Sequence, residues 1–147
     1  MKTVVREREV KRLLAQRLRE EGFMNLKVRY GREHGIDIEA QFPETRRWLY
    51  IEVKGERPGG QATATRRAAL GEALLQILSV YDGSTVCAIA LPFTRGYQNL
   101  VRRILVPLHR LGLHMIFVRE DEVWHLAPGS PGFLPQRVAS LREVLER

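Results

Sequence analysis

Two carboxylates and a lysine, Asp37, Glu52 and Lys54, have a spacing that could bring them to one centre. Asp37 and Glu52 stand at the outer ends of two short apolar segments, joined by the turn-forming residues 43–46 (Pro-Glu-Thr-Arg). If the two ends of that turn pair with each other in a hairpin, Asp37 lies directly opposite Glu52. Opposed residues of an antiparallel pair have Cβ atoms about 5 Å apart, where two negative charges repel. A divalent cation held between them would relieve that repulsion, so the pair is a candidate metal site.

The same register sorts the hairpin side chains into two faces, because side chains alternate along a strand. The apolar face comprises Ile36, Ile38, Ala40, Leu49, Ile51 and Val53. The polar face comprises Asp37, Glu39, Tyr50, Glu52 and Lys54. A solvated hairpin, in which the lysine only neutralises a glutamate, has the same pattern. The basic flanks, the glycine-rich loop at 55–60 and the helix that follows favour a catalytic site.

The three residue types suit metal-dependent cleavage of phosphodiesters. Asp37 and Glu52 are hard oxygen ligands of the kind that Mg²⁺ (or Mn²⁺) prefers, and Mg²⁺ binds one or two protein carboxylates while keeping several waters. A bound metal ion lowers the pKa of its water and polarises the phosphate. Lys54 points to the same face as Glu52, where it could orient the attacking water or neutralise charge on the phosphate.

The composition predicts one soluble, cytoplasmic domain that binds a polyanion. The chain has 147 residues, 44% of them hydrophobic, which is ordinary for a globular protein. Its 24 Lys and Arg exceed its 17 Asp and Glu, giving a net charge of +7. Such a charge favours nucleic acid, with DNA as the expected partner and RNA as an alternative. No apolar run approaches the roughly 20 residues that cross a bilayer, so no membrane partner is expected.

The basic residues are unevenly distributed, because segment 91–118 contains arginines and no acid at all. Arginine-rich surfaces also occur as ion-pair networks in heat-resistant proteins, but such networks account poorly for an acid-free segment. The pattern therefore indicates a nucleic-acid contact surface. Its expected members in this segment are Arg95, Arg102 and Arg103. The stretch that follows Lys54 adds Arg57, Arg66 and Arg67.

Apolar spacing and turn residues predict a mixed sheet flanked by helices, in the order α-β-β-β-α-β-α-β-β. The expected helices are 3–21, 63–81, 96–111 (kinked at Pro107) and 134–146, and the expected strands are 23–30, the two hairpin strands, 85–91, 113–119 and 123–126. This organisation predicts a core domain at 1–127, followed at 128–147 by a linker and a C-terminal amphipathic helix.

This order, with Gly-Ile-Asp-Ile-Glu at 35–39 and Tyr-Ile-Glu-Val-Lys-Gly at 50–55, resembles the PD-(D/E)xK nuclease superfamily. The opening helix ending in Glu-Glu-Gly-Phe resembles the Holliday-junction resolvase and Mrr-like branch. The similarity covers roughly residues 4–91 and extends loosely to about 118. It implies a restriction-endonuclease-like α/β fold and a Mg²⁺-dependent DNA endonuclease of repair, recombination or defence.

The resemblance also implies further site residues. The Val53 carbonyl would be another metal ligand, and an acidic residue on the first helix would complete the set. Glu7 is favoured for that place because it shares a helical face with the apolar stripe, and Glu9 is its rival. Gln76, on the helix after the hairpin, would contact the metal-bound water or a phosphate. The family's proline before the aspartate is Ile36 here, which removes no ligand.

Two alternatives remain open from the sequence. The chain could be a nucleic-acid-binding module that keeps a nuclease-like fold without turnover, although Asp37, Glu52 and Lys54 are all present. Two-fold-symmetric DNA is bound most readily by a homodimer. The C-terminal helix, with its apolar stripe, is either the dimer interface or a helix packed on its own chain.

Overall fold

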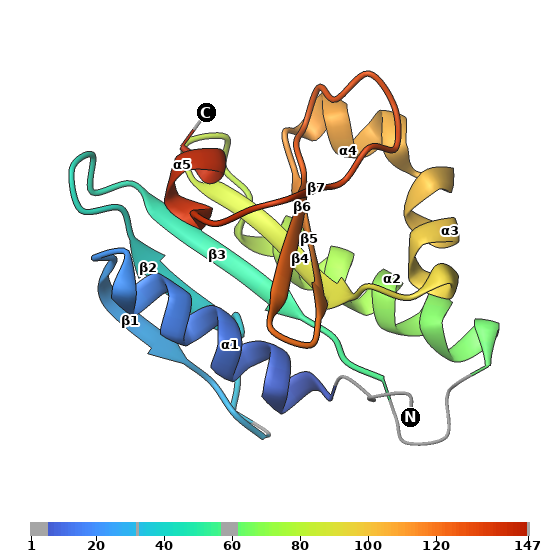
Figure 1. The fold of residues 1–147 in the computed structure, drawn as a ribbon, viewed down its shortest axis with the longest axis horizontal. Coiled ribbons are helices and arrows are strands. Elements are labelled where there is room, and N and C mark those ends of the chain that lie inside the picture. The colour runs from blue at the N-terminus through green and yellow to red at the C-terminus, as the bar shows by residue number, and fades with distance from the viewer. Residues whose placement is uncertain (1–5, 32, 57–61, 147) are drawn as a thin grey trace.

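The chain forms one seven-stranded mixed sheet with helices on both faces (Figure 1). The computed structural model describes residues 6–31, 33–56 and 62–146. The strands are β1 (Met24–Val28), β2 (Ile38–Gln41), β3 (Trp48–Val53), β4 (Val86–Pro92), β5 (His114–Arg119), β6 (Glu122–Leu126) and β7 (Gln136–Arg137). The helices are α1 (Glu7–Glu20), α2 (Thr63–Val80), α3 (Arg95–Arg103), α4 (Leu105–Leu111) and α5 (Leu141–Leu145). The expected mixed α/β architecture is therefore confirmed.

The strands lie side by side in chain order, β1 to β7. Among the strands of the described ranges, only the β3–β4 and β4–β5 pairs are parallel. Parallel neighbours require a crossover connection, which α2 supplies for the first pair and α3 with α4 for the second. The carboxyl ends of β3 and β4 consequently lie at the same end of the sheet. Helices α2 and α3 both begin near that end.

Two apolar layers cover the sheet. Helices α1 and α5 pack on one face, against β2, β3 and the even-numbered residues of β4 such as Ala88 and Ala90. Helices α2, α3 and α4 pack on the other face, against Ile89, Leu91 and residues of β5. All seven residues of β4 are buried, as expected for a central strand covered on both sides. None of the helices in the described ranges is long and apolar enough to cross a lipid bilayer.

The hairpin of β2 and β3 has the predicted register. Ile38 pairs with Ile51, and Ala40 pairs with Leu49. Two backbone hydrogen bonds between Phe42 and the residues 46–47 close the turn, at 3.0 Å each. The turn thus fixes which residues oppose each other at the far end of the hairpin. The apolar face is confirmed for these strands, whereas the Ile36 side chain packs with the α2 layer and not beside Ile38.

The helix predicted at 96–111 with a kink at Pro107 is interrupted as expected, but the interruption is a division into α3 and α4 and lies at Ile104 (φ −116°, ψ 19°). Pro107 explains the break. A proline has no N–H, and its ring clashes with the carbonyl four residues earlier, which is that of Arg103. The chain therefore leaves helical geometry just before the proline and restarts. Leu108 then donates to the Ile104 carbonyl at 3.1 Å.

The predicted helix 134–146 is also wrong in extent. Pro135 disfavours helical geometry at Leu134, whose side chain is 55% exposed. Strand β7 follows and pairs with β6, and the Ser140 side chain then caps the short α5 by accepting from the Glu143 N–H. Leu141 and Leu145 of α5 are buried in the layer that contains α1, so this helix packs on its own chain.

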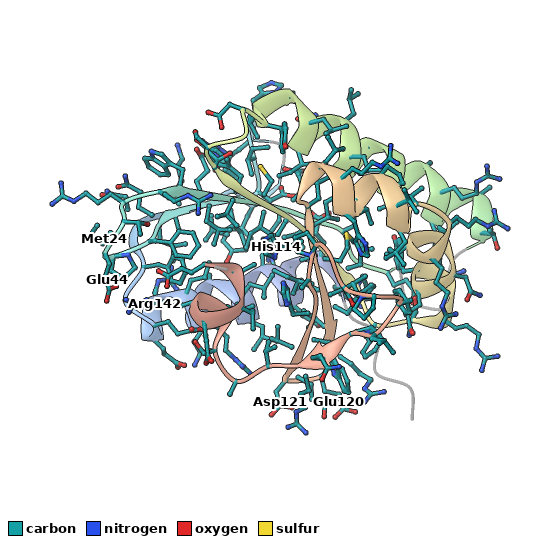
Figure 2. All side chains as sticks on the ribbon, turned by 90° about the horizontal axis from the view of Figure 1, so that it is seen from above. Met24, Glu44, His114, Glu120, Asp121 and Arg142 are labelled. Carbon is teal, nitrogen blue, oxygen red and sulfur yellow. The ribbon has the colours of Figure 1, made fainter. Side chains whose placement is uncertain are left out.

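Helix α5 also contacts the β2–β3 turn, where Arg142 forms an ion pair with Glu44 at 2.6 Å. Figure 2 labels both residues, which lie close together. In helix α2, Leu78 is 42% exposed although the preceding Ile77 is buried. The reason is that the sheet covers a narrow stripe of this helix, formed by Leu70, Ala73 and Ile77. The position after Ile77 lies about 100° around the helix from that stripe.

Candidate carboxylate centre

Asp37 and Glu52 interlock at the point where the β2–β3 ladder ends. The N–H of Asp37 donates to Glu52 Oε1 at 3.0 Å, and the N–H of Val53 donates to Asp37 Oδ2 at 2.8 Å. Regular strand pairing stops one residue earlier, at Ile38 and Ile51. Beyond that pair, side-chain carboxylates replace backbone carbonyls as hydrogen-bond acceptors. The hairpin register thus brings the two predicted acids together.

Glu52 is the acid whose charge is most strongly disfavoured at this centre. Its side chain is only 4% exposed. Burial, followed by the neighbouring Asp37 carboxylate, raises the pKa of Glu52 from its ordinary 4.5 to about 7, although Lys54 and the Asp37 N–H oppose the rise. Glu52 therefore holds a proton through much of the acid range. Two facing carboxylates that repel in a buried position fit a divalent cation.

Lys11 is the third member of the centre, and it was not predicted from the sequence. Its side chain is 2% exposed, and its Nζ lies 3.1 Å from Asp37 Oδ1 and 3.2 Å from Glu7 Oε2. It also donates to the Arg29 carbonyl at 2.7 Å. Burial lowers the pKa of Lys11, but the two carboxylates outweigh that effect and the net pKa is raised. Lys11 is therefore a permanent cation inside the centre.

The first helix presents Glu7 to the centre and Glu9 to solvent. Glu7 reaches the centre through Lys11. Glu9 accepts from the Arg6 N–H at 3.3 Å, a bond that caps the start of α1. Gly55 permits the approach of α1, because a Cβ atom on Gly55 would lie 2.0 Å from the Glu7 nitrogen. The favoured glutamate thus lies near the predicted acids, and its role as a metal ligand stays a prediction.

Lys54 extends from the end of β3 toward α2. Its Nζ lies 3.3 Å from Oε1 of Glu72, a residue that the sequence analysis did not single out. Glu72 is 64% exposed, so this ion pair is weak and leaves Lys54 available to other anions. Gln76 lies one turn further along α2 and is also exposed. The predicted contact of Gln76 with a metal-bound water or phosphate stays a prediction.

Among the described residues, no group of three or more His, Cys, Asp or Glu side chains is arranged to hold a metal ion. Asp37 and Glu52 are the two carboxylates in contact that could hold an ion at this centre, and the ligand role of the Val53 carbonyl stays a prediction. Such a small set is acceptable for Mg²⁺, which retains several waters. Glu7 is the nearest further acid, and it is occupied by Lys11.

The predicted nucleic-acid contacts fall into separate places. Arg66 lies near the start of α2 and Arg95 at the start of α3. Both are at the end of the sheet where Lys54 follows β3. Arg66 is paired with Glu56 at 2.8 Å, so an acid of the protein already neutralises it. Arg57 lies outside the described residues. Exposed side chains of the predicted set are Arg67, Arg95, Arg102 and Arg103, of which the last two lie at the far end of α3.

Two buried histidines on adjacent strands form a polar pair remote in sequence from the centre. Nδ1 of His114 lies 2.8 Å from Nε2 of His125, and Figure 2 places His114 in the interior. Burial, followed by the charges of His125 and Arg47, lowers the pKa of His114 to about 3, so this imidazole is neutral. The pair borders a cavity of about 540 Å³ under segment 127–138. His125 is buried as well, with 4% of its side chain exposed.

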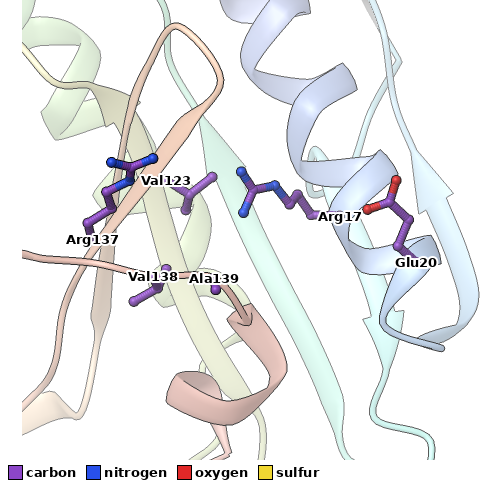
Figure 3. Close-up of a pocket in the computed structure, with 6 residues that line it drawn as sticks. All are labelled: Arg17, Glu20, Val123, Arg137, Val138 and Ala139. Carbon is purple, nitrogen blue, oxygen red and sulfur yellow. The ribbon is translucent and has the colours of Figure 1, made fainter.

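A second cavity, of about 640 Å³, lies between α1 and the β6–β7 edge (Figure 3). Its lining includes Arg17 and Arg137, together with Glu20. None of the predicted catalytic residues lines it. The carboxylate centre at the carboxyl end of β3 is therefore the candidate functional site of the described structure.

Comparison with known proteins shows no family for this chain. No protein-family model matches the sequence, and a search of curated proteins finds no match. The search of solved structures finds the crystal structure of the YaeQ protein from Xanthomonas axonopodis pv. citri. That similarity has a TM-score of 0.41 and 14% identity, and it covers 91% of this chain and 80% of that one. A TM-score this low carries no argument about fold family or function.

Proposed function

We propose that the protein is a Mg²⁺-dependent DNA endonuclease of the PD-(D/E)xK type, with a restriction-endonuclease-like fold. The observation that carries the proposal is the interlocked Asp37–Glu52 pair, in which a buried glutamate has its pKa raised to about 7 by burial and by the facing aspartate. Structural carboxylates are seldom buried against one another. A centre that binds a cation gives such an arrangement a use.

The arrangement of the elements supports the same proposal. The order α1-β1-β2-β3-α2-β4 follows the one that the sequence resemblance implies. Strands β1 to β3 are antiparallel, and β4 returns parallel to β3 after the crossover helix α2. This topology puts Glu52 and Lys54 at the carboxyl end of β3, beside the start of α3.

In this proposal Asp37, Glu52 and the Val53 carbonyl hold the Mg²⁺ ion. The ion, when bound, supplies an activated water and polarises the phosphate. Lys54 carries a charge that can bind a non-bridging phosphate oxygen or orient the attacking water. The exposed Glu72 competes only weakly for this ammonium group, so a phosphate can replace it. Arg67 and Arg95 lie near the same end of the sheet, and their exposed side chains can bind the phosphates of the DNA backbone.

The test is DNA cleavage by the purified protein. Supercoiled, linear and branched DNA are incubated with Mg²⁺ or Mn²⁺, and EDTA is the negative control. We expect cleavage of at least one substrate, and Asp37→Ala should reduce the rate by at least about 10³-fold, as expected for loss of a metal ligand. Absence of cleavage of every substrate, or an Asp37→Ala variant as fast as wild type, would refute the proposal.

A second candidate is a DNA-binding module without turnover. It is favoured by Lys11, whose ammonium already neutralises Asp37, and by the absence of a third acidic ligand among the residues described. In that case wild type and Asp37→Ala bind DNA with similar affinity, the affinity falls steeply with salt, and neither protein cuts. A filter-binding titration at two salt concentrations, run beside the cleavage assay, separates the two functions.

A further inference from the structure

The ammonium group of Lys11 has a complete set of partners. An ammonium has three N–H donors, and the three acceptors are Asp37 Oδ1 at 3.1 Å, Glu7 Oε2 at 3.2 Å and the Arg29 carbonyl at 2.7 Å. The side chain crosses from α1 to the start of β2 and is only 2% exposed. Lysines are almost never fully buried unless they are paired in this way. Lys11 is thus built into the carboxylate centre.

The Asp37 carboxylate is divided between two partners. Its Oδ1 faces Lys11, and its Oδ2 accepts the Val53 N–H. Glu52 approaches from the β3 side and accepts the Asp37 N–H. One side of Asp37 therefore already faces a cation that belongs to the protein, whereas the Glu52 side combines two acids. A second acid, Glu7, lies on the Lys11 side, so replacement of the ammonium would leave two carboxylates around its place.

We propose that Lys11 serves as a resident cation of this centre, so that the centre takes one divalent ion, between Asp37 and Glu52, and Glu7 binds Lys11 instead of the metal. This inference rests on the proposed function in one respect, namely that Asp37 and Glu52 hold a divalent ion. It goes further, because it fixes the number of ions and assigns Glu7 and Lys11 as positioning residues. The lysine holds the Asp37 carboxylate in place before the ion arrives.

The experiment counts bound Mn²⁺ by electron paramagnetic resonance, which measures free Mn²⁺ and needs no substrate. Wild type should bind one ion per chain. Lys11→Gln should bind two, because Asp37 Oδ1 and Glu7 Oε2 then face each other without a cation, and its first ion should bind at least tenfold more tightly. The double variant Lys11→Gln/Glu7→Gln should bind one ion again. Lys27→Gln, on the exposed part of β1, is the matched control and should equal wild type.

The single variant Glu7→Gln tests the assignment without removing the buried charge, and it decides the matter if Lys11→Gln does not fold. We expect one Mn²⁺ per chain with an affinity within about threefold of wild type. A tenfold or greater loss would make Glu7 a metal ligand and overturn the inference. Two ions in wild type, or a folded Lys11→Gln with one ion and unchanged affinity, would overturn it too.

The failure of this inference can be distinguished from failure of the proposed function. If wild type binds one Mn²⁺ and cuts no DNA, the endonuclease proposal fails, and the Mn²⁺ counts still decide the role of Lys11. If wild type cuts DNA but binds two ions, only the inference fails. If neither wild type nor Lys11→Gln binds Mn²⁺, both are overturned.

Discussion

Glu52→Gln is expected to stabilise the metal-free protein at pH 8.5 by on the order of 3 kcal/mol, while it removes DNA cleavage. The pKa of Glu52 is about 7 in the folded chain and 4.5 ordinarily, and each pKa unit corresponds to about 1.4 kcal/mol. Above pH 7 the wild-type fold must therefore hold a buried charge beside Asp37. Glutamine keeps the acceptor for the Asp37 N–H and offers an N–H₂ group to the Asp37 carboxylate.

The sign of the pH dependence follows from the direction of the shift. Between pH 4.5 and 7 the folded chain holds a proton on Glu52 that the unfolded chain has released, so the free energy of unfolding falls as the pH rises through this window. The charged groups that face Glu52 are Asp37, which raises its pKa, and Lys54, which lowers it. Glutamine does not titrate, so the fall should be absent in Glu52→Gln.

The measurement is urea unfolding in EDTA at pH 5 and pH 8.5. The free energy of unfolding of Glu52→Gln should exceed that of wild type by a large amount at pH 8.5 and by a small amount at pH 5, where Glu52 of the folded wild type is largely protonated. Glu72→Gln is the matched control, because Glu72 is exposed, and it should change stability by less than about 0.5 kcal/mol. Equal stability of wild type and Glu52→Gln at pH 8.5 would show that the fold does not raise the pKa of Glu52.

Gly55→Ala is expected to destabilise the fold by about 3 kcal/mol and to displace the start of α1. The added Cβ would lie 2.0 Å from the Glu7 nitrogen and 2.6 Å from its Cα. These are backbone atoms, so no side-chain rotation relieves the clash, and overpacking of this kind typically costs about 1–3 kcal/mol or more. The Gly55 carbonyl also accepts a 3.4 Å hydrogen bond from the buried Tyr97 hydroxyl.

Gly71→Ala provides the control for the loss of glycine flexibility. Gly71 lies inside α2, and a Cβ there would meet no atom within 4 Å. Alanine favours a helix interior over glycine by roughly 0.5–1 kcal/mol, so this variant should be slightly more stable than wild type. Thermal unfolding followed by circular dichroism compares the two. A Gly55→Ala protein as stable as Gly71→Ala would contradict the close approach of α1 to β3.

The hairpin could be predicted from the sequence because the residues that determine it are close together in the chain. A proline-containing turn between two alternating segments sets the register, and the register alone decides that Asp37 opposes Glu52. The mixed sheet likewise follows from the order of periodic segments. The interruption of the helix was predicted at Pro107 but lies at Ile104, since a proline acts on the carbonyl four residues before it and not at its own position.

The contribution of Lys11 depends on contacts between elements far apart in the chain. Its partners Asp37 and Arg29 lie on and before the hairpin, so only the packing of α1 on the sheet brings them together. One local signal was present. Lys11 follows Glu7 by four residues and lies on the same helical face as Leu14, which should have marked it as a lysine directed inward. Glu72 had no comparable signal.

The bonding of the two carboxylates to amides makes the centre visible to a measurement of the backbone. The N–H groups of Asp37 and Val53 donate to Glu52 and Asp37 side chains, not to carbonyls. Any ion drawn to those oxygens withdraws electron density from these two hydrogen bonds. In a ¹⁵N–¹H spectrum, diamagnetic Mg²⁺ should therefore shift the Asp37 and Val53 cross-peaks most, while that of Ala40, inside the ladder, stays in place. Two amide protons would report occupancy without any substrate.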